Sequence, residues 1–287
     1  GDKGSFLTSV IAPLNGLPSA LLLAGMLLLL FSMAFKASVA PFHFWTPDVY
    51  DGAPTVFTSF MATIVKAAVF VAFIRLFDEA FGNLHHKWKL TIALITVATL
   101  FIGNITAVFQ QSVKRMLAFS SISQAGFMLL AIYSMNTDGK EGLLLYVLAY
   151  SLATIGLFAV LAKMSDYSYD GFNGLARQQP FLALLITIFV LSLSGIPLTA
   201  GFLSKFLMLK ATLAAGGSLW LVIVAVVMAV ISISYYFRIL QAMYFKNPEK
   251  ENIITVSPAF KWTLAVLAAL LILLGIFPNL VFGFYYF

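Results

Sequence analysis

The sequence predicts an all-α polytopic membrane protein, and three observations support this fold class. First, 61% of its 287 residues are hydrophobic and only 10% are charged, which lies outside the range of soluble globular domains. Second, apolar stretches long enough to cross a bilayer recur along the chain between short polar loops. Third, lipid offers no hydrogen-bond partner to backbone amides, so even the Val- and Phe-rich stretches are expected to be helices.

Apolar stretches of about 20 residues define roughly eight predicted spans. They cover 17–40, 55–77, 90–109, 113–133, 142–163, 180–214, 219–244 and 259–285. The sixth stretch is too long for one straight helix across a hydrocarbon core of ~30 Å, and "SGIPLTAG" lies in its middle. Gly195 and Gly201 permit unusual backbone angles, and Pro197 lacks an amide hydrogen. We therefore expect a broken helix over 180–214.

The composition and motifs exclude several kinds of chemistry on this chain. It has no cysteine, so disulfides, Cys-ligated iron–sulfur clusters and thiol catalysis are excluded. No P-loop, dinucleotide fingerprint or nucleophile elbow is present, and His43 lies in a different loop from His85 and His86. We therefore expect no metal site, cofactor or redox centre here. The net charge of +6 comes mainly from loop Lys and Arg, which we assign to orientation and lipid contact rather than to nucleic acid.

Three lysines do not follow this loop pattern: Lys36, Lys66 and Lys205. Lys66 lies between long uncharged stretches, at a depth where a lysine costs roughly 2.5 to 3.5 kcal/mol, so its presence indicates function, with a structural hydrogen bond as the alternative. Lys205 follows the predicted break, and broken helices at mid-membrane are recurrent ion sites; a proline kink with an outward-reaching lysine is the alternative. For Lys36, a functional position and snorkelling to the interface beside Trp45 both stay open.

The acidic residues sharpen this hypothesis, because none lies inside a predicted span. All eleven are in or next to loops, at Asp2, Asp48, Asp51, Asp78, Glu79, Asp138, Glu141, Asp166, Asp170, Glu249 and Glu251. A buried lysine is usually neutralised by losing its proton or is paired with a carboxylate. The three lysines therefore either switch between charged and neutral forms or have a partner outside this chain. Both alternatives indicate proton handling.

Polar side chains inside the fourth and fifth spans could hold a water chain for protons. Two groups at helical spacing contribute: Ser120, Ser121, Ser123 and Gln124, and then Tyr146, Tyr150 and Thr154. Hydroxyls and amides on inward faces can order water between widely spaced lysines. For any one of these residues the competing interpretation is a hydrogen bond between helices, worth less than ~1 kcal/mol. The pattern as a set favours a proton path.

With these residues in view, the chain resembles the antiporter-like membrane subunits of proton-pumping NADH:quinone oxidoreductase, respiratory complex I. Multisubunit sodium/proton antiporters share this family. Three segments carry the resemblance: "FKASVAPFHFWTPDVYDGAP", "VKRMLAFSSISQAGFMLLAI" and "LSLSGIPLTAGFLSKF". Within the family, the segment "WTPDVY" is similar to the matching segment of the subunit N branch.

The resemblance implies two inverted repeats, each with a broken helix that bears a lysine. Residues 1–81 would end the first repeat, with its broken helix over 17–48 and the following helix over 55–77. Residues 90–245 would form the second repeat and 258–287 the C-terminal helix. Pro41, Pro47 and Pro54 oppose a continuous helix through the first break. Asp48 and Asp51 are then expected in the loop that ends that broken helix at the aqueous surface.

The resemblance also implies roles for the lysines. Lys66 would store a proton, Lys36 would modulate it against a glutamate of the family's fifth helix, and Lys205 would exchange with the opposite aqueous side. That glutamate would lie upstream of Gly1, so the N-terminal part of the subunit is expected to be missing. Gln124 departs from the family, because many relatives carry a histidine there. The fifth span also lacks the ionisable residue of other antiporter-like subunits, a gap that we expect Tyr150 to bridge through water.

The sequence thus predicts a proton-translocating membrane subunit of complex I. NADH, flavin, iron–sulfur clusters and quinone would then belong to partner subunits, and the other membrane subunits and the lipid bilayer would surround this chain. A cation/proton antiporter subunit is the alternative, and a structural subunit with relic lysines is a third reading. The expected location is a bacterial inner membrane, with an organellar energy-transducing membrane as the alternative.

Overall fold

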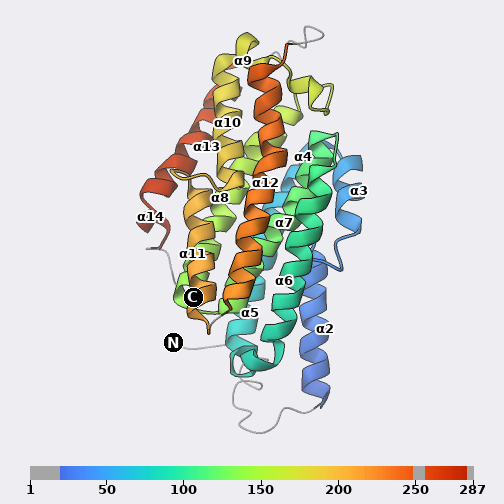
Figure 1. The fold of residues 1–287 in the computed structure, drawn as a ribbon, viewed down its shortest axis with the longest axis vertical. Coiled ribbons are helices and arrows are strands. Elements are labelled where there is room, and N and C mark those ends of the chain that lie inside the picture. The colour runs from blue at the N-terminus through green and yellow to red at the C-terminus, as the bar shows by residue number, and fades with distance from the viewer. Residues whose placement is uncertain (1–19, 217, 248–255, 283–287) are drawn as a thin grey trace.

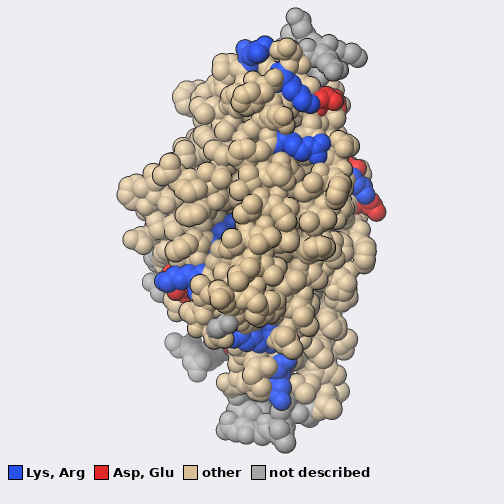
Figure 2. Space-filling view, viewed as in Figure 1, with Lys and Arg blue, Asp and Glu red and all other residues tan. Residues whose placement is uncertain are grey.

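The computed structural model describes residues 20–216, 218–247 and 256–282. These residues form an elongated helical bundle, and no β-strand occurs among them (Figure 1). Five helical stretches are long and apolar enough to cross a membrane, and two shorter apolar helices accompany them. The predicted all-α fold class is therefore confirmed. Figure 2 shows a surface that is mostly uncharged, with more charged side chains toward the two ends than on the face between them.

The first broken helix consists of α2 (Ala20–Lys36) and α3 (Trp45–Gly52). Figure 1 shows α2 in the lower half of the bundle and α3 in the upper half. In the break, Ser38 has a φ of +64°, and the amide of Ala40 donates to Thr99 Oγ1 at 3.1 Å. These contacts supply part of the hydrogen bonding that a continuous helix would provide.

The predicted loop around Asp48 and Asp51 is wrong, because both residues belong to the helix α3. Pro47 does not prevent this helix, since it lies in the first turn, where backbone amides have no intrahelical acceptor in any case. Residues 17–19 of the first predicted span lie outside the described residues.

The next span is continuous through three segments, α4 (Thr55–Phe60), η1 (Met61–Val65) and α5 (Lys66–Phe81). The middle segment is a turn of π-helix, and Lys66 follows it directly. The helix runs past the predicted end at residue 77, because its charged last turns are held by ion pairs of Arg75 with Glu79 and of Asp78 with Lys140. A 3₁₀ turn, η2 (Gly82–Leu84), then leads into α6 (His85–Val108).

The helix α7 (Val113–Ser134) is the central element, and nearly all of its residues are buried. A helix that is buried on every side positions its polar residues against several neighbours at once. Its contact with α6 is close, because a Cβ at Gly103 would lie 2.5 Å from the backbone nitrogen of Ser123. The helix α8 (Thr137–Leu161) follows, with Asn136 accepting from the amide of Gly139 at 2.9 Å as its N-cap.

The second broken helix consists of α10 (Pro180–Ser194) and α11 (Ala200–Ala214). The predicted break is present and lies at residues 195–199, where Gly195 adopts the left-handed φ of +79°. Close packing across the break requires Gly201, because a Cβ there would lie 2.0 Å from the carbonyl oxygen of Ser192. Figure 1 shows α10 in the upper half and α11 in the lower half, so the chain runs through the two broken helices in opposite directions.

Two long helices complete the bundle, α12 (Leu219–Phe245) and α13 (Pro258–Ile276). The last predicted span, 259–285, is too long, because the helix ends before Pro278 and a short helix α14 (Asn279–Phe282) follows. Between α8 and α10 the chain forms a 3₁₀ turn η3 (Asp170–Phe172) and a short helix α9 (Leu175–Gln178).

Candidate functional site

Lys66 lies in the interior of the bundle, with 1% of its surface exposed. Its Nζ donates a hydrogen bond to the backbone oxygen of Ser121 on α7 at 2.6 Å, and a second one to the Ser121 hydroxyl. The π-helical turn before Lys66 is of a kind that is frequent at functional sites. The amine is therefore held by neutral oxygen atoms, and no carboxylate pairs with it among the described residues.

Lys205 occupies the break of the second broken helix, with 4% of its surface exposed. Its Nζ donates to the carbonyl oxygen of Leu193 at 2.8 Å and lies 4.6 Å from the centre of the Phe127 ring. A Cβ at Gly195 would lie 3.0 Å from Lys205 Cδ, so the glycine leaves room for the side chain. The left-handed turn at Gly195 thus presents the last carbonyl groups of α10 to the lysine.

Gln124 connects this break to the tyrosines of α12. Its Nε2 donates to the same Leu193 oxygen at 3.1 Å and to the hydroxyl of Tyr236 at 2.9 Å. The Tyr236 hydroxyl also forms a hydrogen bond with Ser120 Oγ. A continuous polar path therefore runs from Lys205 through Leu193, Gln124 and Tyr236 to Ser120, all in the buried interior.

The tyrosines of α8 extend the path toward Lys66. Tyr146 donates its hydroxyl hydrogen to Gln124 Oε1, and its ring stacks on that of Tyr150 with 6.4 Å between the centroids. The Tyr150 hydroxyl lies near Ser121 and Thr154, without a direct hydrogen bond to a described residue. Tyr150 thus lies between the acceptor of Lys66 and the cluster around Gln124.

Two of the predicted path residues do not join this chain of hydrogen bonds. The hydroxyls of Ser123 and Thr154 are buried and have no direct partner in the described part of the protein. Ser123 lies instead near Tyr235, which donates to Asn104 Oδ1 at 3.1 Å. Helical spacing had placed these residues correctly on inward faces, but it could not distinguish which neighbour each would meet.

Lys36 differs from the other two lysines. It is the last residue of α2, directly before the first break, and its side chain is exposed. The described residues offer it no hydrogen-bond or ion-pair partner. Its expected partnership with an upstream glutamate stays a prediction.

The sequence reasoning missed two tyrosines that belong to the site. Tyr236 is the link between Ser120 and Gln124, and the sequence signal was the hydroxyl-rich segment "SISYYF" in the seventh span. Tyr50, on α3, is almost fully buried, and its hydroxyl lies near those of Ser121 and Ser38. Tyr50 thereby lies between the first break and the residue that accepts from Lys66.

The donor set of the site is hydroxyls, amides and amines. Among the described residues, no group of three or more His, Cys, Asp and Glu side chains is placed to hold a metal ion. Hydroxyl groups can both donate and accept a hydrogen bond, so they can pass a proton along a chain, whereas amide and carbonyl groups orient it. The arrangement is suited to proton movement between two buried amines.

The fold and the site together define an antiporter-like membrane protein, with oppositely directed broken helices and two buried lysines with a series of polar side chains between them. The chain belongs to the family described as "NADH:quinone oxidoreductase/Mrp antiporter, TM", whose model matches residues 6–232. This membership confirms the resemblance of the sequence and identifies the chain as an integral membrane protein.

Its relatives include subunit N of the NADH-quinone oxidoreductases of two bacteria. The Trichlorobacter lovleyi protein is 39% identical over 284 residues, which are 97% of this chain and 58% of that protein. The Cytophaga hutchinsonii protein is 40% identical over 287 residues, 98% of this chain and 62% of that protein. The chain thus spans about three fifths of the length of these curated relatives.

Solved structures show the same fold. A chain of respiratory complex I from Thermus thermophilus matches with a TM-score of 0.82 and 36% identity, covering 93% of this chain and 60% of that one. A chain of the Mrp complex from Dietzia also matches with a TM-score of 0.82, covering 96% of this chain and 62% of that one. Its identity is only 20%, so this second likeness concerns the fold alone.

Proposed function

We propose that this chain is the C-terminal part of a proton-translocating membrane subunit of an NADH:quinone oxidoreductase. The observation that carries the proposal is the polar path between Lys66 and Lys205, because each amine donates to a neutral oxygen at one end of it. The identity of 38–40% with relatives named as subunit N supports this assignment over a cation/proton antiporter.

In this function, hydroxyl groups relay the proton and Gln124 keeps them aligned. Tyr150 and Tyr146 lie on the Lys66 side, and Tyr236 and Ser120 lie around Gln124. An amide does not gain or lose protons near neutral pH, so Gln124 acts by fixing the two tyrosine hydroxyls at its oxygen and nitrogen. Water on both sides of the Tyr150 hydroxyl, toward Ser121 and toward the Tyr146 hydroxyl, would complete the path.

Electrostatics couples the two ends of the path. Two ammonium groups repel each other strongly in a medium of low dielectric constant. Protonation of one lysine therefore favours release of the proton from the other, provided that a path joins them. Lys36, next to the first break, would shift this balance when it meets a carboxylate upstream of residue 1. Quinone reduction, with NADH, flavin and iron–sulfur clusters on partner subunits, would supply the energy.

Copurification tests the proposal against its rivals. The protein is extracted from its native membrane through a tag on this chain, and the associated subunits and cofactors are identified by mass spectrometry and absorbance spectroscopy. We expect subunits that carry flavin and iron–sulfur clusters, together with NADH-dependent quinone reduction. A complex of small membrane subunits alone, without redox cofactors, would contradict the proposal and support the antiporter.

A further inference from the structure

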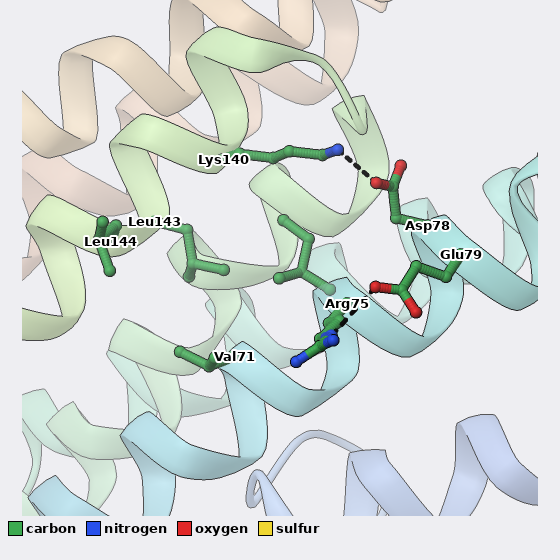
Figure 3. A pocket seen from close by; sticks show the side chains of 8 residues that line it. Val71, Arg75, Asp78, Glu79, Lys140, Leu143 and Leu144 are labelled. Atoms are coloured by element: carbon green, nitrogen blue, oxygen red, sulfur yellow. Dashed lines mark hydrogen bonds and ion pairs between the residues drawn. The ribbon is translucent and has the colours of Figure 1, made fainter. Parts of the chain in front are cut away.

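A shallow pocket between α5 and α8 lies outside the lysine path. It is small, with a volume of about 50 Å³, and it is partly open to the surroundings. Figure 3 shows the charged lining residues at one side and the apolar ones at the other. The lining consists of Val71, Ile74, Arg75, Asp78, Glu79, Lys140, Leu143 and Leu144. It has two cations and two carboxylates, so its net charge is zero.

The depth of these residues matches the layers of a bilayer. Lys66 is near the middle of the span, and Val71 lies about 8 Å further along the helix at ~1.5 Å per residue. On the same scale Asp78 and Glu79 lie about 18 to 20 Å from Lys66, whereas half a hydrocarbon core is ~15 Å. The charged end of the pocket is therefore at headgroup depth, and the apolar end is at the depth of the acyl chains.

The charges are paired but still accessible. Arg75 Nε lies 3.0 Å from Glu79 Oε1, and their side chains are 66% and 40% exposed. Lys140 forms an ion pair with Asp78 across the two helices, with side chains 20% and 38% exposed. Each carboxylate can accept more hydrogen bonds than its partner supplies, and each cation has further donors. A ligand that carries both signs of charge can therefore bind without leaving either pair uncompensated.

From this pocket we infer a binding site for a zwitterionic phospholipid with a primary ammonium headgroup, of the phosphatidylethanolamine type. The ammonium donates to Asp78 and Glu79, and the phosphate accepts from Arg75 and Lys140. The acyl chains lie along Val71 and its apolar neighbours. A net anionic headgroup is less suited, because carboxylates already offset both cations. Phosphatidylcholine is also less suited, because its ammonium has no hydrogen to donate and the pocket has no aromatic ring to surround it.

Photo-crosslinking tests this inference in the whole complex that contains the chain, reconstituted in lipid nanodiscs. Three probes share one photoreactive acyl chain and carry ethanolamine, choline or glycerol headgroups. Exposed charge contacts are individually weak, and the ethanolamine headgroup makes two of them, one through its ammonium and one through its phosphate. We therefore expect the ethanolamine probe to label the α5 and α8 peptides about threefold to tenfold more than the other probes do. Equal labelling by the three probes overturns the inference. If none of the three probes labels these peptides, the inference is also overturned, because this result would mean that a protein segment covers the pocket.

A change of selectivity provides the second test. Asp78→Asn with Glu79→Gln leaves the two cations unpaired, so the preference should pass to the anionic glycerol probe. A protein that fails to fold would lose labelling without such a reversal. Asp138→Asn is the matched control. It breaks the ion pair between Asp138 and Lys210, which are 2.9 Å apart and do not line the pocket. Lipid labelling does not depend on proton transport. The lipid-site inference can therefore fail while the proposed function holds, and the proposed function can fail while the lipid-site inference holds.

Discussion

Lys205 and Gln124 donate hydrogen bonds to one and the same carbonyl oxygen, that of Leu193, at 2.8 and 3.1 Å. This oxygen is presented at the end of α10, two residues before the left-handed turn at Gly195. The shared acceptor fixes the amine of the second broken helix against the central helix α7. It also means that the partners of Lys205 are neutral, and a neutral oxygen stabilises an ammonium less than a carboxylate does.

Gln124→Leu should lower proton transport and stability together. The substitution removes the hydrogen bonds to Tyr146 and Tyr236. The Tyr236 hydroxyl keeps Ser120 as a partner, whereas the buried Tyr146 hydroxyl is left without one, which costs about 1 to 3 kcal/mol. The measurements are NADH-driven proton uptake in inverted vesicles and thermal unfolding of the purified complex. Gln110→Leu is the control, because the side-chain amide of Gln110 donates only to the nearby backbone oxygen of Thr106, at the end of α6. Wild-type transport by Gln124→Leu would remove Gln124 from the path.

Tyr150→Phe separates transport from stability. Its hydroxyl forms no direct hydrogen bond with a described residue, so its removal should leave the unfolding temperature nearly unchanged. If the hydroxyl relays protons, the rate of coupled proton uptake should fall by about tenfold or more. Tyr244→Phe, which removes an exposed hydroxyl bonded to Thr187, should change neither quantity. Unchanged proton uptake by Tyr150→Phe would mean that the path does not pass through this residue.

Gly195→Ala should impair the second break. Its φ of +79° is unfavourable for a residue with a Cβ by about 1 to 2 kcal/mol, and the added atom would press on Lys205. We expect a lower unfolding temperature and reduced proton uptake. Gly82→Ala provides the comparison, because a Cβ at Gly82 meets no atom within 4 Å. Equal behaviour of the two variants would show that the geometry of the break is not required.

Gly103→Ala tests the packing that holds the central helix. A Cβ at this position would lie 2.5 Å from the backbone of Ser123, and backbone atoms cannot move aside as a flexible side chain can. Overpacking of this kind typically costs about 1 to 3 kcal/mol. We expect a lower unfolding temperature of the complex, whereas Gly25→Ala, with open space around it, should leave it unchanged.

Much of the fold follows from the sequence, because lipid restricts the backbone to helices. The spans were predicted from apolar stretches, and Gly195 with Pro197 indicated the second break. The helix α3 was missed, since its eight residues contain Pro47 and two aspartates, a composition typical of a loop. The end of α5 was placed too early for a similar reason. Its charged last turns look like a loop until Asp78 meets Lys140 from α8.

The site was predictable only in part. Burial of Lys66 and Lys205 follows from their uncharged surroundings, and Gln124 was singled out among the polar residues of its span. Which hydroxyls meet depends on contacts between helices far apart in sequence, such as Tyr236 with Ser120. No periodicity within one helix contains that information. Lys36 is exposed and has no hydrogen-bond or ion-pair partner among the described residues, so its role stays a prediction.

The central claim is that Lys66 and Lys205 carry protons for a redox-driven pump. The most direct measurement is the number of protons translocated per NADH oxidised in vesicles that carry Lys66→Ala, Lys205→Ala or the control Lys210→Ala. Lys210 lies on the same helix as Lys205 but is exposed and paired with Asp138. We expect both buried-lysine variants to show a lower ratio and depressed quinone reduction, with the control unchanged. A full proton ratio and full activity with both buried lysines replaced would contradict the account.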